Sequence, residues 1–319
     1  MEQWKSQVFY TLIIVLITLA SCTKDVKVDI PGFEEQLVVD GRIDTDGFPV
    51  VLLSKSKDIY ASTDLNAYLG SFVYDATISV SNGSTTTSLQ LFAIADLPLE
   101  SQKRVAEMLS LEFNEIAFLP IQVYSTTDVT MKGEMGKQYT LTINWSGKTY
   151  SGTTSLLPSV SLDNLYWKAD LAETNYGLCW ARLSDPPNVS NAYKWEPKNI
   201  TLKSDGNPKD IIFRHAGNPY FSDKFFDGLT FEFDTRYPKK DTSYLDGYEK
   251  YYKKGDTVVI RFSRIDDNVF NFFDKKEAQQ QSAGNPFSTP VNAKSNISNG
   301  ALGIWAGFSA LYDTLYCWP

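Results

Sequence analysis

The chain has 319 residues, of which 43% are hydrophobic and 21% are charged, as in ordinary globular proteins. Its formal net charge of −8 argues against nucleic acid as a partner, because phosphate backbones bind to clustered cations. A chain of this length can bury a large core and typically divides into two domains.

Residues 1–21 are predicted to be a lipoprotein signal peptide. The apolar run at 8–19 is shorter than the roughly 20 residues that span a membrane, but suits the hydrophobic region of a secretory signal. It ends in Leu19–Cys22 (LASC), which resembles the bacterial lipobox, so Cys22 is the expected lipidation site. The alternative is an ordinary signal peptide that leaves Cys22 as a free thiol. Several acyl chains would tether the protein firmly to a bilayer without crossing it.

Lys24 and Asp25 follow directly after this cysteine. They resemble the lysine-plus-acidic signal that sends lipoproteins of the Bacteroidota to the outer face of the outer membrane. Residues 22–35 are therefore expected to be a lipidated tether. We expect the protein to be anchored in the outer membrane and to face the cell exterior.

Residues 36–156 are predicted to form an immunoglobulin-like β-sandwich. Short runs at 37–43, 76–80 and 139–145 have the composition or the alternation of β-strands. The hairpin signal Asn82-Gly83 follows the second run. Tyr139 begins the third run at the position of a tyrosine corner, a feature of such sandwiches.

A helix at about residues 97–112 is predicted to interrupt this sandwich. Asp96 is a suitable N-cap for it, and Pro98 suits its first turn. Residues 157–319 are predicted to form a second β-rich domain, with a helix at about 267–281. The expected fold is therefore mainly β.

The segment at residues 220–252 is rich in aromatic side chains. One interpretation is a stacking surface for a ligand or a docking surface for a protein. The other, which is the commoner role of aromatic residues, is packing in the core and at strand edges. The candidate binding residues are Tyr220, Phe225, Phe226, Tyr248 and Tyr251.

Two cysteines, Cys179 and Cys317, remain after Cys22. In an oxidising compartment such a pair can form a disulfide. The alternative is a pair of buried free thiols, and the sequence leaves both alternatives open.

The chain lacks the common catalytic motifs, and we expect no enzymatic activity, metal site or cofactor. His215 is the only histidine, which removes most metal sites and most catalytic triads. Asp266 and Asp267 are more typical of a helix cap than of a glycosidase pair. The run from Asp44 to Gly47 begins like a calcium loop but lacks the closing glutamate, which favours an ordinary turn.

A series of short motifs runs through the chain, mostly in its second half. They are LVVDG (37–41), DPPN (185–188), NAY (191–193), FSD (221–223), FDG (226–228), NPFSTP (285–290), SNI (295–297) and GALGIW (300–305). Together with the lipobox, their order and spacing resemble the Bacteroidota lipoprotein family catalogued as domain of unknown function 4249. Members are commonly encoded beside TonB-dependent receptors, so the resemblance implies such a barrel as partner. It supplies no catalytic residues.

Two functions are compatible with these features. The first is a non-catalytic binding or accessory subunit of a TonB-dependent receptor, for nutrient capture or uptake. The alternative is a structural subunit of a larger outer-membrane assembly, such as a secretion or adhesion complex, without a small ligand. An aromatic-lined pocket in the second domain would favour the first, and a flat apolar patch would favour the second.

Overall fold

A computed structural model describes residues 33–58, 62, 64–282 and 292–318. Cys22, Lys24, Asp25 and the motif at 285–290 lie outside these ranges, so what they predict stays a prediction. The helices and strands of the described ranges all lie in one compact unit, Glu35–Pro319. No helix in these ranges is long and apolar enough to cross a membrane.

The described part of the chain is mainly β, as predicted, and its strands form two sheets. The larger sheet has the strand order β11-β10-β14-β15-β1-β2-β5-β4-β3-β6-β7. In chain order its strands are β1 (Leu37–Asp44), β2 (Val50–Lys55), β3 (Thr77–Ser81), β4 (Thr86–Ala93), β5 (Gln122–Ser125), β6 (Gln138–Trp145), β7 (Lys148–Ser155), β10 (Ala192–Asn199), β11 (Tyr220–Ser222), β14 (Thr257–Ile265) and β15 (Leu302–Tyr316).

The smaller sheet is built around one strand. It contains β8 (Asn164–Ala169), β9 (Tyr176–Ser184), β12 (Thr230–Thr235) and β13 (Tyr252–Lys253), and β9 pairs with the other three. The helices are α2 (Leu65–Leu69), α3 (Leu99–Leu109), α4 (Phe113–Ile116) and α5 (Asp267–Ser282), with short 3-10 turns η1 (Ile94–Asp96) and η2 (Val129–Met131).

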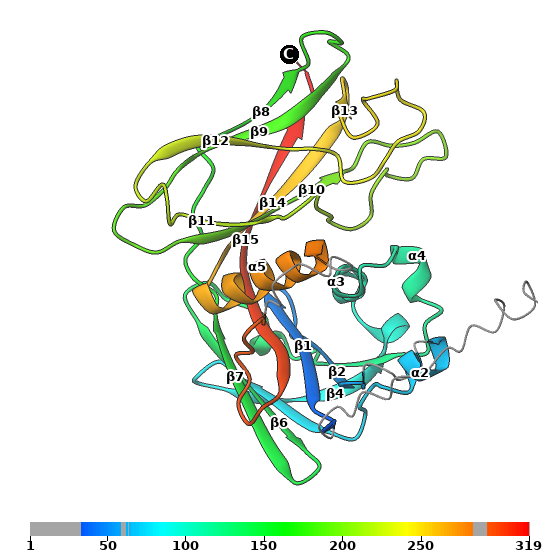
Figure 1. Cartoon of the computed structure of the whole chain (residues 1–319), viewed down its shortest axis with the longest axis vertical. Helices are drawn as coiled ribbons and strands as arrows, with labels where there is room; N and C mark the ends of the chain where they lie inside the picture. Colours follow the sequence, from blue (N-terminus) through cyan, green and yellow to red (C-terminus); the bar gives the residue numbers. More distant parts are fainter. Residues whose placement is uncertain (1–32, 59–61, 63, 283–291, 319) are drawn as a thin grey trace, which may run out of the picture. The chain divides into compact units, whose positions relative to one another are not determined.

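Strand β15 connects the two halves of the larger sheet, because it pairs with two different strands along its length (Figure 1). From Leu302 to Phe308 it runs parallel to β1, and from Ser309 to Tyr316 it runs antiparallel to β14. The sheet therefore continues across the boundary predicted after residue 156. The division into two domains stays a prediction.

The parallel pairing of β1 with β15 requires a glycine at position 303. Gly303 has a φ of +90°, and a Cβ on it would overlap the carbonyl oxygen of Val39 on β1. Two residues later, Trp305 is fully buried, and its indole N–H donates to the carbonyl oxygen of Tyr139 at 3.0 Å. The glycine-rich motif thus allows the close backbone approach expected of it and places a tryptophan in the core.

The local turn signals of the first half are confirmed. The β3–β4 hairpin turns at Asn82, whose side-chain oxygen accepts from two backbone N–H groups of the loop. The Tyr139 hydroxyl accepts from the N–H of Glu134 at 2.8 Å and donates to the carbonyl of Lys132 at 3.1 Å, as in a tyrosine corner. An immunoglobulin-like sandwich for residues 36–156 stays a prediction.

Both predicted helices are present. Helix α3 lies within the insertion predicted at 97–112, and α5 coincides with the helix predicted at 267–281. The predicted cap is wrong, because Asp96 ends η1 and Pro98 is the N-cap of α3. Leu97 between them has an extended backbone, with a ψ of 154°, so the two helical turns are separate.

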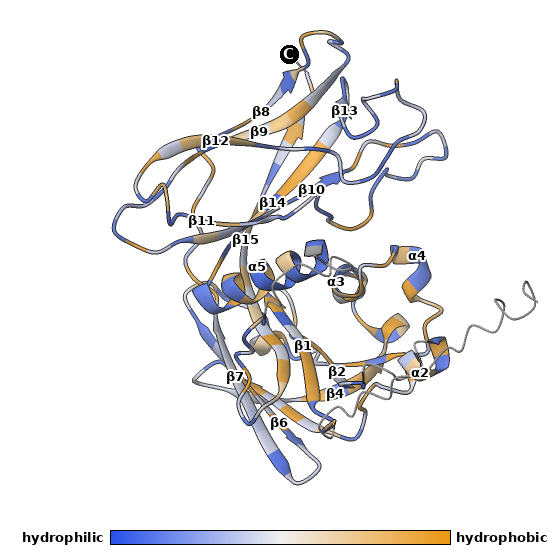
Figure 2. Ribbon diagram, viewed as in Figure 1, coloured by the Kyte–Doolittle hydropathy of each residue, from blue (hydrophilic) through white to orange (hydrophobic). Residues whose placement is uncertain are grey.

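Apolar residues concentrate along strands such as β1 and β14, whereas much of α5 is hydrophilic (Figure 2). One core cluster surrounds Tyr139 and Trp305 and joins residues of the first half of the chain to residues that precede or lie on β15. A second contains Trp167 and Cys179 of the smaller sheet with Phe262 of the larger sheet, so the smaller sheet packs against β10 and β14. Helices α3 and α5 contribute to two further clusters.

Replacing Gly303 by alanine should lower the free energy of unfolding more than Gly300→Ala does. Both glycines have positive φ, at +90° and +77°, but only a Cβ at position 303 would meet the neighbouring strand. The backbone conformation costs about 1–2 kcal/mol in either variant, and the clash adds about 1–3 kcal/mol to Gly303→Ala. Urea unfolding measures both losses, and equal losses would contradict the close approach.

Candidate functional site

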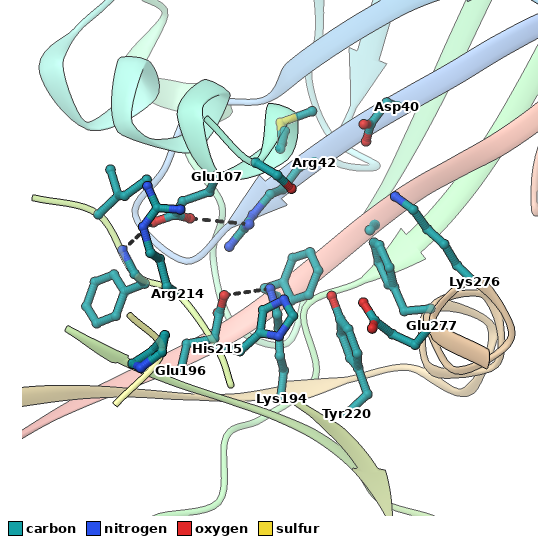
Figure 3. A pocket seen from close by; sticks show the side chains of 18 of the residues that line it. Asp40, Arg42, Glu107, Lys194, Glu196, Arg214, His215, Tyr220, Lys276 and Glu277 are labelled. Carbon is teal, nitrogen blue, oxygen red and sulfur yellow. Dashed lines mark hydrogen bonds and ion pairs between the residues drawn. The ribbon is translucent and has the colours of Figure 1, made fainter. Parts of the chain in front are cut away.

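A cavity of about 380 Å³, here called the charged cavity, lies where β1, β10, β11 and β15 meet α3 and α5 (Figure 3). Strand alternation places Asp40 and Arg42 of β1 in its lining, together with Lys194 and Glu196 of β10. The labelled side chains in Figure 3 are Asp40, Arg42, Glu107, Lys194, Glu196, Arg214, His215, Tyr220, Lys276 and Glu277.

Buried ion pairs form a continuous chain along this cavity. Asp44 is contacted by Arg42 at 2.7 Å and by Arg104 at 2.9 Å. Arg104 also contacts Glu107 at 3.1 Å, and Arg261 contacts the same carboxylate at 2.9 Å. Helix α3 is thereby joined to β1 on one side and to β14 on the other.

Glu196 extends the chain of ion pairs onto β10. Arg261 contacts it at 2.7 Å and Lys194 at 2.8 Å. The seven side chains of this ion-pair network are between 0% and 12% exposed. Four cations face three carboxylates, so the buried network carries one net positive charge.

Burial and neighbouring charges shift the pKa values of two groups of the ion-pair network. Burial lowers the pKa of Lys194, and the attraction of Glu196 only partly offsets it. Burial alone would raise the pKa of Asp44, but Arg104 and Arg42 outweigh it and the pKa is lowered. Asp44 therefore stays ionised in the interior.

Aromatic rings complete the wall of the charged cavity. Phe308, the last residue of β15 that pairs with β1, lies 4.3 Å from the Arg42 guanidinium and 5.0 Å from the Lys194 ammonium, measured to the ring centroid. Tyr220 stacks on Phe273 of α5 with centroids 4.9 Å apart. Each cation over Phe308 gains a cation–π contact in addition to its ion pair.

A second pocket, here called the aromatic pocket, has a volume of about 320 Å³. Its largest lining side chains are Trp195, Phe221, Phe226, Phe231 and Phe233. The rings are in contact, with centroids 4.2 Å apart for Phe226 and Phe231 and 4.8 Å apart for Trp195 and Phe233. The indole N–H of Trp195, which is 5% exposed, has no hydrogen-bond partner within the described ranges.

Strand β10 separates the two pockets. Lys194 and Glu196 line the charged cavity, while Trp195 between them lines the aromatic pocket, as alternation along a strand requires. His215 lines both, so the pockets adjoin at its loop. The combined site suits a ligand with an apolar, ring-like part and a charged or polar part.

The structure separates the aromatic residues predicted to form one binding surface. Tyr220 is buried in the wall of the charged cavity, and Phe226 lines the aromatic pocket. Phe225, beside it, is 87% exposed.

Tyr248 and Tyr251 lie elsewhere and line neither pocket. Their rings are 4.9 Å apart, and Tyr248 stacks on Tyr176 at 5.0 Å and donates to Asp170 at 3.0 Å. The five residues therefore lie in four separate places, and a binding role for them stays a prediction.

Cys179 and Cys317 are both fully buried and neighbour one another as free thiols. Burial raises the pKa of the Cys179 thiol, and its hydrogen bond with Cys317 raises it further. The fold brings together the two thiols that a disulfide would join, and the bridge itself stays a prediction.

The acidic residues predicted from the sequence to lie in a helix cap and in a turn occupy these positions in the structure. Asp266 accepts from the N–H of Val269 in the first turn of α5 at 2.9 Å. The N–H of Gly47 donates to the carbonyl oxygen of Asp44 at 2.9 Å, as in an ordinary turn. The His215 ring contacts a backbone carbonyl oxygen of its own loop at 2.6 Å, and no side chain of the described residues hydrogen-bonds to it.

The ion-pair network was not predicted from the sequence. The available signal was weak: Arg42 interrupts an apolar strand, and Lys194 and Glu196 flank a tryptophan. Charged residues at such positions are usually exposed. Only the contacts among β1, α3, β10 and β14 identify these side chains as buried partners.

A family model described as a domain of unknown function (DUF4249) matches residues 23–311. This range includes every residue that lines either pocket. No curated protein matches the chain.

Replacing Asp44 by asparagine should lower the free energy of unfolding at pH 7 by about 3–5 kcal/mol, because Arg42 and Arg104 would lose a buried carboxylate. Since its pKa is lowered by folding, Asp44 stabilises the fold above its ordinary pKa of 3.8 and loses this effect as the pH falls through the lowered value.

The difference from wild type should therefore shrink below pH 4. Asp46→Asn is the matched control, because Asp46 is exposed and lies in the same turn. We expect it to change stability by less than about 0.5 kcal/mol. Urea unfolding between pH 3 and pH 7 measures both, and a pH-independent difference for Asp44→Asn would contradict the assignment.

Proposed function

The chain belongs to the family described as domain of unknown function DUF4249. We propose that it is a surface-exposed outer-membrane lipoprotein that binds without catalysis, as an accessory subunit of a TonB-dependent receptor in nutrient capture or uptake. The lipobox-like segment supports the anchor, and the gene neighbourhood typical of the resembled family supports the receptor as partner.

The observation that carries ligand binding is the aromatic pocket next to the charged cavity. Their volumes, about 320 and 380 Å³, are in the range of small-molecule sites. Closely packed aromatic rings bind the apolar surface of a ligand, and the adjoining charged groups select its orientation. A flat apolar patch would have favoured a purely structural role instead.

The contact with the barrel would involve the loop between β11 and β12. Phe225 and Leu229 of this loop are 87% and 56% exposed. Interface centres are enriched in aromatic residues and poor in charge, because the burial of a ring contributes most there. Phe225 is the one predicted binding residue that is fully available to a partner.

The same exposed residues support the alternative, a structural subunit of an outer-membrane assembly without a small ligand. The two functions differ in what the pockets do. A native mass spectrum of the purified protein with candidate nutrients would show a bound small molecule only for the first function.

Cys22→Ser should abolish metabolic labelling with a fatty acid and release the protein from membranes. A Lys24→Ala, Asp25→Ala double variant is the matched comparison, because it keeps the lipidation site and alters only the export signal. We expect it to remain in the membrane fraction but to become inaccessible to protease added to whole cells. Membrane retention of Cys22→Ser would contradict lipidation, and unchanged protease access in the double variant would contradict the export signal.

Phe225→Ala should weaken co-purification with the barrel and leave the melting temperature nearly unchanged, because the side chain makes few contacts within the chain. Removing a side chain that anchors an interface typically costs 1 kcal/mol or more, roughly a fivefold loss of affinity. Leu171→Ala is the control, because Leu171 is 99% exposed on another loop. Equal co-purification of both variants with wild type would remove Phe225 from the interface.

A further inference from the structure

Two loops bring three carboxylates together at one end of β10. The loop between β9 and β10 carries Asp185, and the loop between β11 and β12 carries Asp223 and Asp227. Each residue offers a carboxylate oxygen within 4.8 Å of the others. These loops and the strand ends beside them contain the DPPN, NAY, FSD and FDG motifs, and the three aspartates of these motifs line neither pocket.

Hydrogen bonds fix the orientation of these carboxylates. Asp185 accepts from the Tyr193 hydroxyl at 2.7 Å and from the Gly228 N–H at 3.1 Å. The other two each accept from one backbone N–H, at 2.6 Å for Asp223 and 2.9 Å for Asp227. The side chain of Asn191 also hydrogen-bonds to Asp223, whereas one oxygen of Asp227 remains without a hydrogen bond from the described part of the chain.

No cationic side chain of the described ranges forms an ion pair with this cluster. Asp185 and Asp223 are each only 4% exposed. Buried carboxylates that repel one another without a counter-charge are costly to a fold. The contrast with the ion-pair network, where each carboxylate has two or more cations, is clear.

An independent observation comes from Asn191, which is fully buried. Its backbone N–H donates to Asp223, and its side chain borders the same carboxylate. The side-chain nitrogen donates to the carbonyls of Pro186 and Val189, so the amide oxygen points away from them. That oxygen has no hydrogen-bond partner among the described residues.

We propose that Asp185, Asp223, Asp227 and the side-chain oxygen of Asn191 form a calcium-binding site. All four offer oxygen ligands, which are the ligands of hard cations, and the site has no histidine or cysteine to favour zinc. Calcium accepts six to eight oxygen ligands in irregular geometry, whereas magnesium requires a near-ideal octahedron. Waters and loop carbonyls would complete the shell.

The local backbone is suited to such a site. Pro186 and Pro187 fix two φ angles directly after Asp185, and Gly228 with a φ of +72° packs against Pro187. The expectation of no metal site rested on missing histidines and missing linear motifs. Here the ligands come from separate loops, which no linear motif reveals.

Calcium at this position would hold the loop that supplies Phe226 to the aromatic pocket, since Asp223 and Asp227 flank this residue. The proposed calcium site does not depend on the proposed function, because none of its three carboxylates lines either pocket.

The test is a calcium titration of the purified full-length protein after treatment with a chelator and removal of the chelator. Calcium chloride should release or absorb heat in a saturable manner in calorimetry. At 100-fold excess over Kd it should raise the melting temperature by about 4–5 °C. Magnesium chloride at the same concentration should give a clearly smaller shift, and an equal shift would overturn the assignment of calcium.

Asp227→Asn should abolish at least half of the calcium-dependent shift. Asp227 is exposed and asparagine keeps the acceptor for the Asn188 N–H, so this variant should fold. Asp223→Asn should abolish the shift entirely.

The control is Asp205→Asn, since Asp205 is also exposed and also accepts from a backbone N–H, of Asn207 at 2.9 Å. It should respond to calcium like wild type. An absent response in wild type, or a full response in Asp227→Asn, would overturn the site.

Discussion

The buried ion pairs centred on Asp44, Glu107 and Glu196 are the constraint on which the rest of the structure depends. Cations from at least two elements contact each carboxylate, and Arg261 alone joins α3 to β10. Such a network adds little stability compared with an apolar core, but it strongly penalises any arrangement that leaves one charge unpaired. It therefore fixes the positions of β1, α3, β10 and β14 relative to each other.

The site follows from this constraint. The network holds charged residues on one face of β10, so the opposite face is left for Trp195 and the phenylalanines of the aromatic pocket. Phe308 lies under Arg42 and Lys194 where β15 changes from one partner strand to the other. The charged cavity, the aromatic pocket and the continuity of the larger sheet thus meet within a few residues of β10 and β15.

The cluster of Asp185, Asp223 and Asp227 has the opposite charge imbalance to the ion-pair network. In the network, more cations than carboxylates are buried, whereas in the cluster carboxylates are buried without a cation from the described chain. A bound divalent ion would offset most of the negative charge of the cluster. It would also connect the loop that carries Phe225 and Phe226 to the rigid turn at Pro186.

The sequence by itself determined the local features: the mainly β character, the hairpin at Asn82, the corner at Tyr139 and the two longer helices. Each depends on alternation, turn residues or helical periodicity within about 15 residues. Which strands pair with β15, which charges are buried, and which aromatic residues share a pocket depend on contacts between distant segments. The local signals around Arg42 and Arg261 are too weak to distinguish them from surface arginines, because burial is decided by packing and not by neighbours in the chain. For that reason only the tertiary structure decided which residues form the two pockets and the ion-pair network.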